Sequence, residues 1–110
     1  MDISLNFDFE SNLPMVEAML DQVKQNALRK IGFLVEGRAK LNAPVDTGVL
    51  RGSIRHNVNG DSVVIGTDVE YALVVEKGSS RHQAQPYLTP AVEDNVSLIK
   101  QIIESEYGTI

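Results

Sequence analysis

The chain begins with alternating apolar and polar residues and then changes to a helical spacing. Ile3, Leu5, Phe7 and Phe9 alternate with polar side chains, which predicts a half-buried strand. Apolar residues then recur at steps of mostly three and four, at Leu13, Val16, Leu20, Val23, Ala27, Ile31, Leu34 and Val35. This spacing predicts an amphipathic helix that starts at a cap formed by Ser11 or Asn12. It ends near Leu41, because Ala43-Pro44 disfavours helical backbone.

The predicted helix is long for a chain of this size. It would measure about 43 Å, whereas a compact chain of 110 residues is roughly 35 Å across. We therefore expect the helix to bend or to project past its own core. Gly32 and Gly37 lie in its C-terminal half, where they either allow close packing or mark a kink.

A β-hairpin is predicted after the turn residues 44–48. Ile54, His56 and Val58 alternate, Asn59-Gly60 is typical of a type I′ turn, and residues 62–67 return as the second strand. A turn at Asn59-Gly60 places Ile54 opposite Ile65 and His56 opposite Val63, all on one face.

The C-terminal half contains a third apolar run and a last helix. Residues 71–76 fit a strand or a single helical turn, and the adjacent Val74 and Val75 favour a strand. Residues 77–85 form a polar loop, and Thr89 is expected to cap a helix with Pro90 at its first position and Gly108 at its end. The order β-α-β-β-β-α predicts one α+β domain over residues 1–110, with helices packed on a small antiparallel sheet.

Composition narrows the classes of function. The chain carries 10 Lys+Arg against 15 Asp+Glu and has no cysteine, which excludes a disulfide framework, a zinc knuckle and a thiol nucleophile. No apolar run approaches the ~18 residues that a bilayer requires, and the first ten residues lack the basic start of a secretory signal. We therefore expect a soluble cytosolic protein.

Charge is distributed unevenly along the chain. Residues 1–21 carry −5, residues 24–55 carry +5, and residues 56–110 carry −5. The acidic total argues against tight nucleic-acid binding that is independent of sequence. The alternation fits head-to-tail contacts between copies, and it also fits an ordinary mixed solvated surface.

No residue pattern predicts catalysis, a cofactor or a metal. His56 falls on the apolar face of the hairpin, where a hydrogen-bonded structural histidine is expected, and His82 has no further ligands at coordinating spacing. Glu70 and Glu76 are carboxylates without a predicted cleft, and Ser79-Ser80 lacks a nucleophile-elbow context. The sequence therefore predicts a protein that is not an enzyme.

Three segments together resemble one phage morphogenesis family. Residues 39–54 resemble its a-K-x-x-A-P-v-D-T-G-x-L-r-x-S-I signature, and residues 64–78 resemble its v-G-t stretch followed by Y-A-x-x-v-E-x-G. Residues 85–91 resemble its q-P-f/y-L-x-P-A stretch before the final helix. The family comprises small neck or tail-completion proteins, also described as minor tail or head–tail joining proteins, of HK-type long-tailed phages.

The resemblance implies a structural virion protein that forms a ring between the head connector and the tail. It implies hexamers in the virion, phage head-connector and tail proteins as partners, and genomic DNA that passes without specific binding, and it leaves open whether the chain is a monomer in solution. No membrane and no cofactor are implied, and the expected location is the neck or tail of the virion, reached from the host cytoplasm. A tail terminator, a capsid-associated minor protein, a monomeric adaptor whose first strand pairs with another sheet edge, and a nuclease or lysis accessory remain alternatives.

The motif residues have a physical reading as well. We expect Asp46 to accept backbone N–H groups, Gly48 to take a positive φ, and Leu50 and Ile54 to enter the core. The structural motif residues are Pro44, Asp46, Thr47, Gly48, Leu50, Ser53, Tyr71, Glu76, Gly78, Pro86 and Pro90, of which the last two prolines rigidify the approach to the final helix. Contacts between subunits are expected at Arg51, Arg55, Arg81 and His82, with Glu76 as a further candidate.

Overall fold

The computed structural model describes residues 1–6, 14–44 and 48–108. The elements along this part of the chain are β1 (Asp2–Asn6), α1 (Pro14–Asn42), α2 (Val49–Ser53), β2 (Arg55–Asn59), β3 (Ser62–Gly66), α3 (Ala72–Lys77), α4 (Leu88–Glu93) and α5 (Val96–Tyr107). The strands form an antiparallel sheet in the order β1-β3-β2. The predicted α+β class, with a long N-terminal helix and a C-terminal helix on a small antiparallel sheet, is confirmed. None of the described helices combines the length and hydropathy needed to span a membrane.

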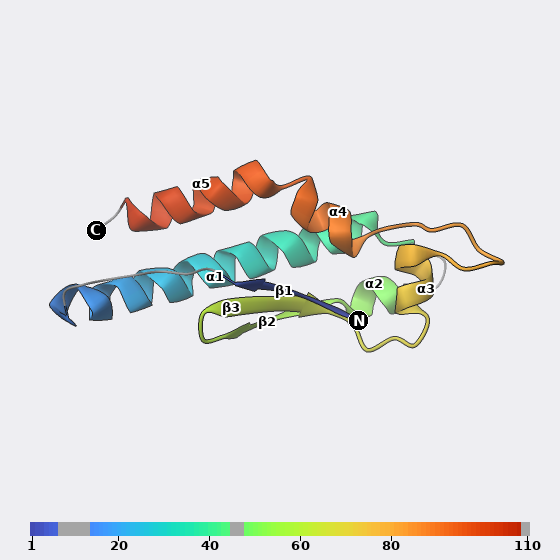
Figure 1. Cartoon of the computed structure of the whole chain (residues 1–110), viewed down its shortest axis with the longest axis horizontal. Helices are drawn as coiled ribbons and strands as arrows, with labels where there is room; N and C mark the ends of the chain where they lie inside the picture. Colours follow the sequence, from blue (N-terminus) through green and yellow to red (C-terminus); the bar gives the residue numbers. More distant parts are fainter. Residues whose placement is uncertain (7–13, 45–47, 109–110) are drawn as a thin grey trace.

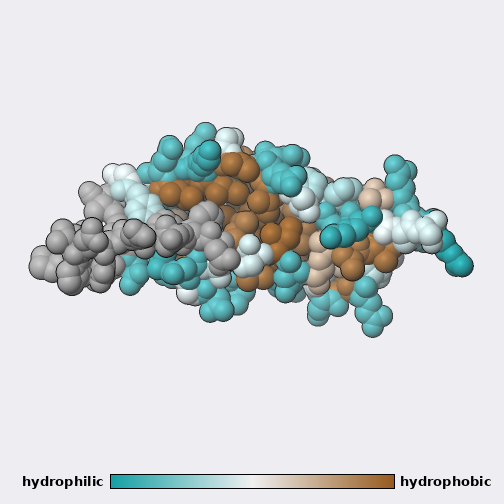
Figure 2. All heavy atoms as spheres, viewed as in Figure 1, coloured by the Kyte–Doolittle hydropathy of each residue, from teal (hydrophilic) through white to brown (hydrophobic). Residues whose placement is uncertain are grey.

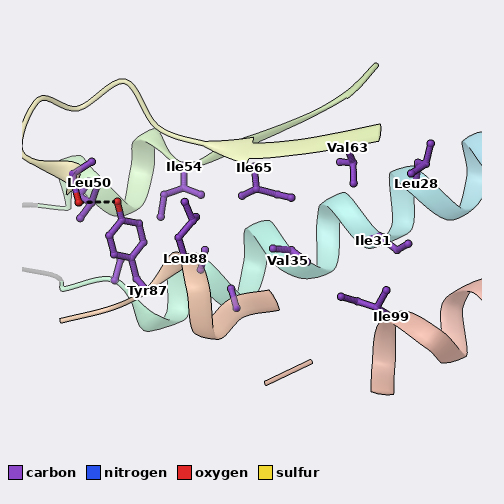
Figure 3. Close-up of a cluster of buried hydrophobic side chains, with 14 residues drawn as sticks. Leu28, Ile31, Val35, Leu50, Ile54, Val63, Ile65, Tyr87, Leu88 and Ile99 are labelled. Carbon is purple, nitrogen blue, oxygen red and sulfur yellow. Dashed lines mark hydrogen bonds between the residues drawn. The ribbon is translucent and has the colours of Figure 1, made fainter. Parts of the chain in front are cut away.

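Helix α1 lies between two layers. Figure 1 shows the sheet on one side of it and α4 and α5 on the other. Leu28, Ile31 and Val35 of α1 are fully buried. Figure 3 shows them between Ile65 and Val63 of β3 and Ile99 of α5. The helix therefore holds both outer layers in place, and the core runs along its length.

The molecule is elongated because α1 is longer than its core. It measures 55 × 22 × 22 Å, and Figure 1 shows the first turns of α1 beyond both the hairpin and the end of α5. Near the hairpin tip, Lys24 pairs with Asp61, and the Gln25 side-chain amide donates to the Gly60 carbonyl at 3.0 Å. The expectation of a helix that projects past its own core is confirmed.

The predicted hairpin is present, but its register differs from the prediction. Residues 60 and 61 form the turn, so that His56 pairs with Ile65 and Val58 with Val63. The predicted pairing of Ile54 with Ile65 and His56 with Val63 is therefore wrong by two residues. A type I′ turn at Asn59-Gly60 requires positive φ at both residues. Among the described residues only glycines have positive φ, and Gly60 has φ +60°. Asn59 therefore stays in the strand, and the inward face of β2 is unchanged.

Residues 72–77 form helix α3 and not the predicted strand. Helical spacing brings Ala72 and Glu76 to the same side of the chain, and both are buried, whereas Leu73 and Val74 are exposed. On a strand, residues 72, 74 and 76 would lie on one face, so Val74 would be buried together with Ala72 and Glu76. Val74 is exposed instead, which a helix allows. Tertiary contacts therefore override the β-propensity of the adjacent valines.

The last helical region is divided in two. Helix α4 begins at Leu88, so Thr89 is not the cap, and a break at residues 94–95 separates α4 from α5. The buried Asn95 side chain donates to the Ala91 carbonyl at 2.9 Å and stabilises the break. The predicted end at Gly108 is confirmed. The element order is accordingly β-α-α-β-β-α-α-α, and not β-α-β-β-β-α.

The two glycines of α1 have different surroundings. A Cβ at Gly32 would lie 2.4 Å from His56 Cδ2 and 3.0 Å from Val63 Cγ2, so this glycine allows the sheet to pack closely on α1. A Cβ at Gly37 would have no atom within 4 Å among the described residues. Gly37 therefore weakens the exposed helix by about 1 kcal/mol relative to alanine, and the described residues give no packing reason for it.

Candidate functional site

The first motif forms the connection from α1 to α2. Pro44 follows the end of α1, and Gly48 precedes α2 with φ +73°. This conformation is strained for residues with a side chain, which confirms the expectation for Gly48. Leu50 and Ile54 enter the core as predicted, with exposed fractions of 4% and 0%. Asp46 and Thr47 lie outside the described residues.

Polar side chains of this motif reach its neighbours on both sides. The Arg51 guanidinium donates to the Ala43 carbonyl at 3.2 Å, at the end of α1. The Ser53 hydroxyl donates to the Leu50 carbonyl at 2.7 Å and lies 2.5 Å from the Thr67 hydroxyl. Because Thr67 belongs to the second motif, the Ser53–Thr67 contact links the first motif to the second.

Glu76 links the second motif to the third. Its carboxylate is 4% exposed and accepts hydrogen bonds from the backbone N–H groups of Tyr87 (3.1 Å), Leu88 (2.7 Å) and Thr89 (3.3 Å). These donors belong to the start of α4, where no preceding helical turn supplies acceptors. A carboxylate is the preferred partner there, because the helix dipole is positive at this end. Glu76 is therefore a cap supplied from another helix, which leaves little of its side chain exposed for the predicted contact with another subunit.

Tyr87 makes a second connection between α3 and α4. Its side chain is fully buried, and its hydroxyl donates to the Ala72 carbonyl at 3.2 Å, the dashed bond in Figure 3. The Asn42 side-chain amide donates to the Tyr87 carbonyl at 3.3 Å, which adds the end of α1 to the same junction. Burial, together with the nearby charge of Glu76, raises the pKa of Tyr87 to about 12.

The polar loop between α3 and α4 is held by its own backbone. Gln85 N–H donates to the Val75 carbonyl at 2.8 Å, and Ser79 N–H donates to the His82 carbonyl at 2.9 Å. A Cβ at Gly78 would lie 2.8 Å from Ala84 N, so the loop closes tightly over this glycine. Pro86 is exposed before α4, whereas Pro90 is half-buried in its first turn. The loop presents side chains to solvent on an ordered backbone.

A cleft lies where the motifs meet. Its volume is about 370 Å³, and it is lined by Pro44, Leu50, Tyr71, Val74, Val75, His82, Gln83 and Gln85. Tyr71 and Val74 are also exposed at the surface. Among the described residues, the lining is mostly apolar and amide side chains with one imidazole.

The predicted interface residues come from three parts of the chain: α2, β2 and the loop between α3 and α4. Arg51 is half-buried against the end of α1, and Arg55 is exposed on β2, where it donates to the Gly52 carbonyl at 3.2 Å. Arg81 and His82 are exposed on the loop. Within the part of the chain that the structure describes, no hydrogen bond or ion pair joins any two of these four residues.

His56 has the structural environment that its position predicted. Its Nδ1 lies 3.1 Å from a Glu36 carboxylate oxygen, and its ring meets the Phe33 ring edge-on at 4.5 Å between centroids. Burial acts to raise the pKa of Glu36, but the His56 hydrogen bond and the Lys40 charge outweigh it, so the pKa lies below its ordinary value. The described residues contain no group of three or more His, Cys, Asp or Glu side chains placed to hold a metal.

Comparison with protein families matches residues 7–78 to the HK97 gp10-like family, described as "Bacteriophage HK97-gp10, putative tail-component". The match covers well over half of the chain. The chain belongs to the HK97 gp10-like family. Comparisons with curated proteins and with solved structures found no match.

Membership in the HK97 gp10-like family identifies a phage tail component and confirms the resemblance noted in the motifs. The match ends at Gly78, so the third motif lies beyond it. The structure joins that motif to the matched region through Glu76 and Tyr87. The sequence motifs assign no role to the Asn42 or Thr67 side chain, because each acts through a partner distant in the chain.

Proposed function

We propose that this chain is a non-catalytic structural subunit of the phage head–tail junction, which assembles as a ring between the head connector and the tail. The proposal rests on one observation, which is that polar side chains of the family motifs bond to groups within the chain. Glu76, Arg51 and Ser53 bond to backbone or side-chain groups within the chain. Polar groups used in this way build a rigid block and leave its outer surfaces for contacts, as a structural subunit requires.

The charge distribution supports passage of DNA through such a ring. The chain has a net charge of −5, and residues 56–110 carry −5. A lumen lined by acidic groups offers few cations to replace phosphate counterions, so DNA would not adhere to it. The proposed partners are the head connector and the tail proteins, and the proposed location is the virion, reached from the host cytoplasm. Six copies per ring are proposed from the family resemblance.

Removal of the gene from a phage that carries it tests the proposal. We expect DNA-filled capsids and free tails of normal length in electron micrographs, with joining restored by the wild-type chain. Tails of abnormal length would instead identify a tail terminator, and normal infectious particles would refute a role in the virion and favour an adaptor.

Charge reversal tests the predicted interface residues separately. Arg55→Glu with Arg81→Glu alters two exposed side chains and should leave the fold unchanged by circular dichroism. We expect unjoined heads and tails if these arginines contact other subunits. Arg51 is unsuitable for this test, because its guanidinium bonds to the end of α1. Normal joining by the double variant would show that both arginines are only solvated.

A further inference from the structure

Helix α1 carries an apolar row that the described part of the chain leaves exposed. Phe33 and Leu41 have exposed fractions of 66% and 71%, and Gly37 lies midway between them. The three positions follow each other at steps of four, which is one ridge of a helix surface. We call Phe33, Gly37 and Leu41 the α1 row. Arg29, four residues before Phe33, extends the same ridge, and Arg38 is adjacent to Gly37.

Gly37 forms a notch in the α1 row. Gly32, one turn away, is explained by His56 and Val63, which would collide with a Cβ there. Gly37 is exposed, and the described residues place no atom within 4 Å of a Cβ at its position. A notch between two exposed apolar side chains allows a foreign helix or side chain to approach the α1 backbone closely.

A second exposed apolar surface lies on α3, at one end of the molecule. Tyr71, Leu73 and Val74 have exposed fractions of 45%, 52% and 39%. We call these three residues the α3 face. Figure 2 shows hydrophobic atoms over this end of the molecule, separate from the larger apolar area over α1 and α5. Glu70 lies three and four residues before Leu73 and Val74, and Asp68 precedes it in the same connection.

The net charges beside the two surfaces are opposite in sign. Arg29 and Arg38 near the α1 row are exposed, as are Asp68 and Glu70 before the α3 face, whereas the exposed Lys77 follows Leu73 by four residues. In residues 14–44 and 48–108, none of these five side chains takes part in an ion pair. Two copies joined through their α1 rows alone would bring like charges together. A contact between the α1 row and the α3 face brings unlike charges together.

We propose that the α3 face of one copy packs on the α1 row of the next copy, with the α3 side chains entering the notch at Gly37. The contact joins two different surfaces, so it is heterologous and closes into a ring or continues as a filament. It rests on the proposed function, because it names the subunit contact of the proposed ring. Apolar burial supplies most of its affinity, and the charges set its register.

Two single variants test the contact in the full-length chain. Leu41→Asp disrupts only the α1 row, and Leu73→Asp disrupts only the α3 face. Each should weaken self-association of the wild-type chain at least about tenfold in sedimentation velocity. Mixed together, they should form a one-to-one dimer, because each supplies the intact surface that the other lacks. Val96→Asp changes an apolar side chain of similar exposure elsewhere and should associate as the wild type does.

Gly37→Ala separates association from folding. It should raise the melting temperature, because alanine favours the helix, and should weaken self-association several-fold, because its methyl group fills the notch. The proposal is overturned if Leu73→Asp alone still associates as the wild type, if the mixture forms no dimer, or if Gly37→Ala associates normally. It is also overturned if the wild type stays monomeric at about 1 mM.

The function test gives a separate result. A chain that restores infectious particles but fails the mixing test refutes this contact and leaves the proposed function in place. A chain that passes the mixing test but is dispensable for particle assembly supports this contact as a self-association surface and refutes the proposed function.

Discussion

Removal of the Glu76 carboxylate should be the most destabilising single change at the motif junction. In the wild type, Oε1 accepts from Tyr87 N at 3.1 Å and Leu88 N at 2.7 Å, and Oε2 accepts from Thr89 N at 3.3 Å. Hydrogen bonds to a charged group contribute roughly 1.5–3 kcal/mol each, and the longest of these contributes least. Tyr87 and Leu88 are buried, so water cannot fully replace the lost acceptor. We therefore expect Glu76→Ala to lower the free energy of unfolding by about 3–5 kcal/mol.

This loss is a large part of the roughly 5–15 kcal/mol that stabilises a typical domain. At roughly 4 °C for each kcal/mol, the melting temperature should fall by about 12–20 °C. Glu76→Gln retains Oε1 for Tyr87 and Leu88 but turns an amide N–H₂ group towards Thr89 N–H. It also removes the charge, so we expect an intermediate loss of about 1–2 kcal/mol.

Thermal and urea unfolding followed by circular dichroism measure both variants. Glu93→Ala is the matched control, because Glu93 is an exposed carboxylate of α4 and its loss should change stability by less than about 0.5 kcal/mol. If Glu76→Ala unfolds at the same temperature and urea midpoint as Glu93→Ala, the carboxylate does not cap α4 and the account of the motif junction is wrong.

Three further predictions concern single positions. Gly32→Ala should lower the free energy of unfolding by about 1–3 kcal/mol, because its methyl group meets His56 and Val63. Gly37→Ala should raise the free energy of unfolding by about 0.5–1 kcal/mol. Urea unfolding compares the two variants, and equal effects would contradict the packing described for Gly32. Gly48→Ala should cost about 1–2 kcal/mol in the same assay, because its φ of +73° is strained for alanine, and an unchanged midpoint would contradict that strain. Raising the pH from 10 to about 12 should destabilise the wild type by about 2 kcal/mol through Tyr87, because the unfolded tyrosine ionises at its ordinary pKa while the buried one ionises only near pH 12. Tyr87→Phe should lose that part of the pH dependence, and an identical pH profile for the two chains would refute it.

The spacing of apolar residues was sufficient to predict the elements in which buried positions recur regularly along one segment. The steps of three and four predicted α1, and Ile31 and Val35, four residues apart, enter the same core in the structure. The alternation at His56 and Val58 predicted β2 and its inward face, which depends only on the strand period. Ser11 and Asn12, the predicted cap of α1, lie outside the described residues.

The local sequence pattern gave a wrong prediction where two backbone conformations are close in energy. Val74-Val75 favoured a strand by propensity, but burying Ala72 and Glu76 together required a helix. The hairpin turn shifted by one residue for a similar reason. Gly60 takes positive φ without strain, whereas a turn one residue earlier would also demand it of Asn59.

The sequence by itself determined the fold class, the long helix and the family, because these depend on residues close together along the chain. Only the tertiary structure decided what the motif residues do. Glu76 carries no local signal that its carboxylate caps a helix starting twelve residues later, and Phe33 and Leu41 carry none that they stay uncovered. A side chain's partners depend on how distant segments pack, and the surface left exposed is known only once every layer is in place.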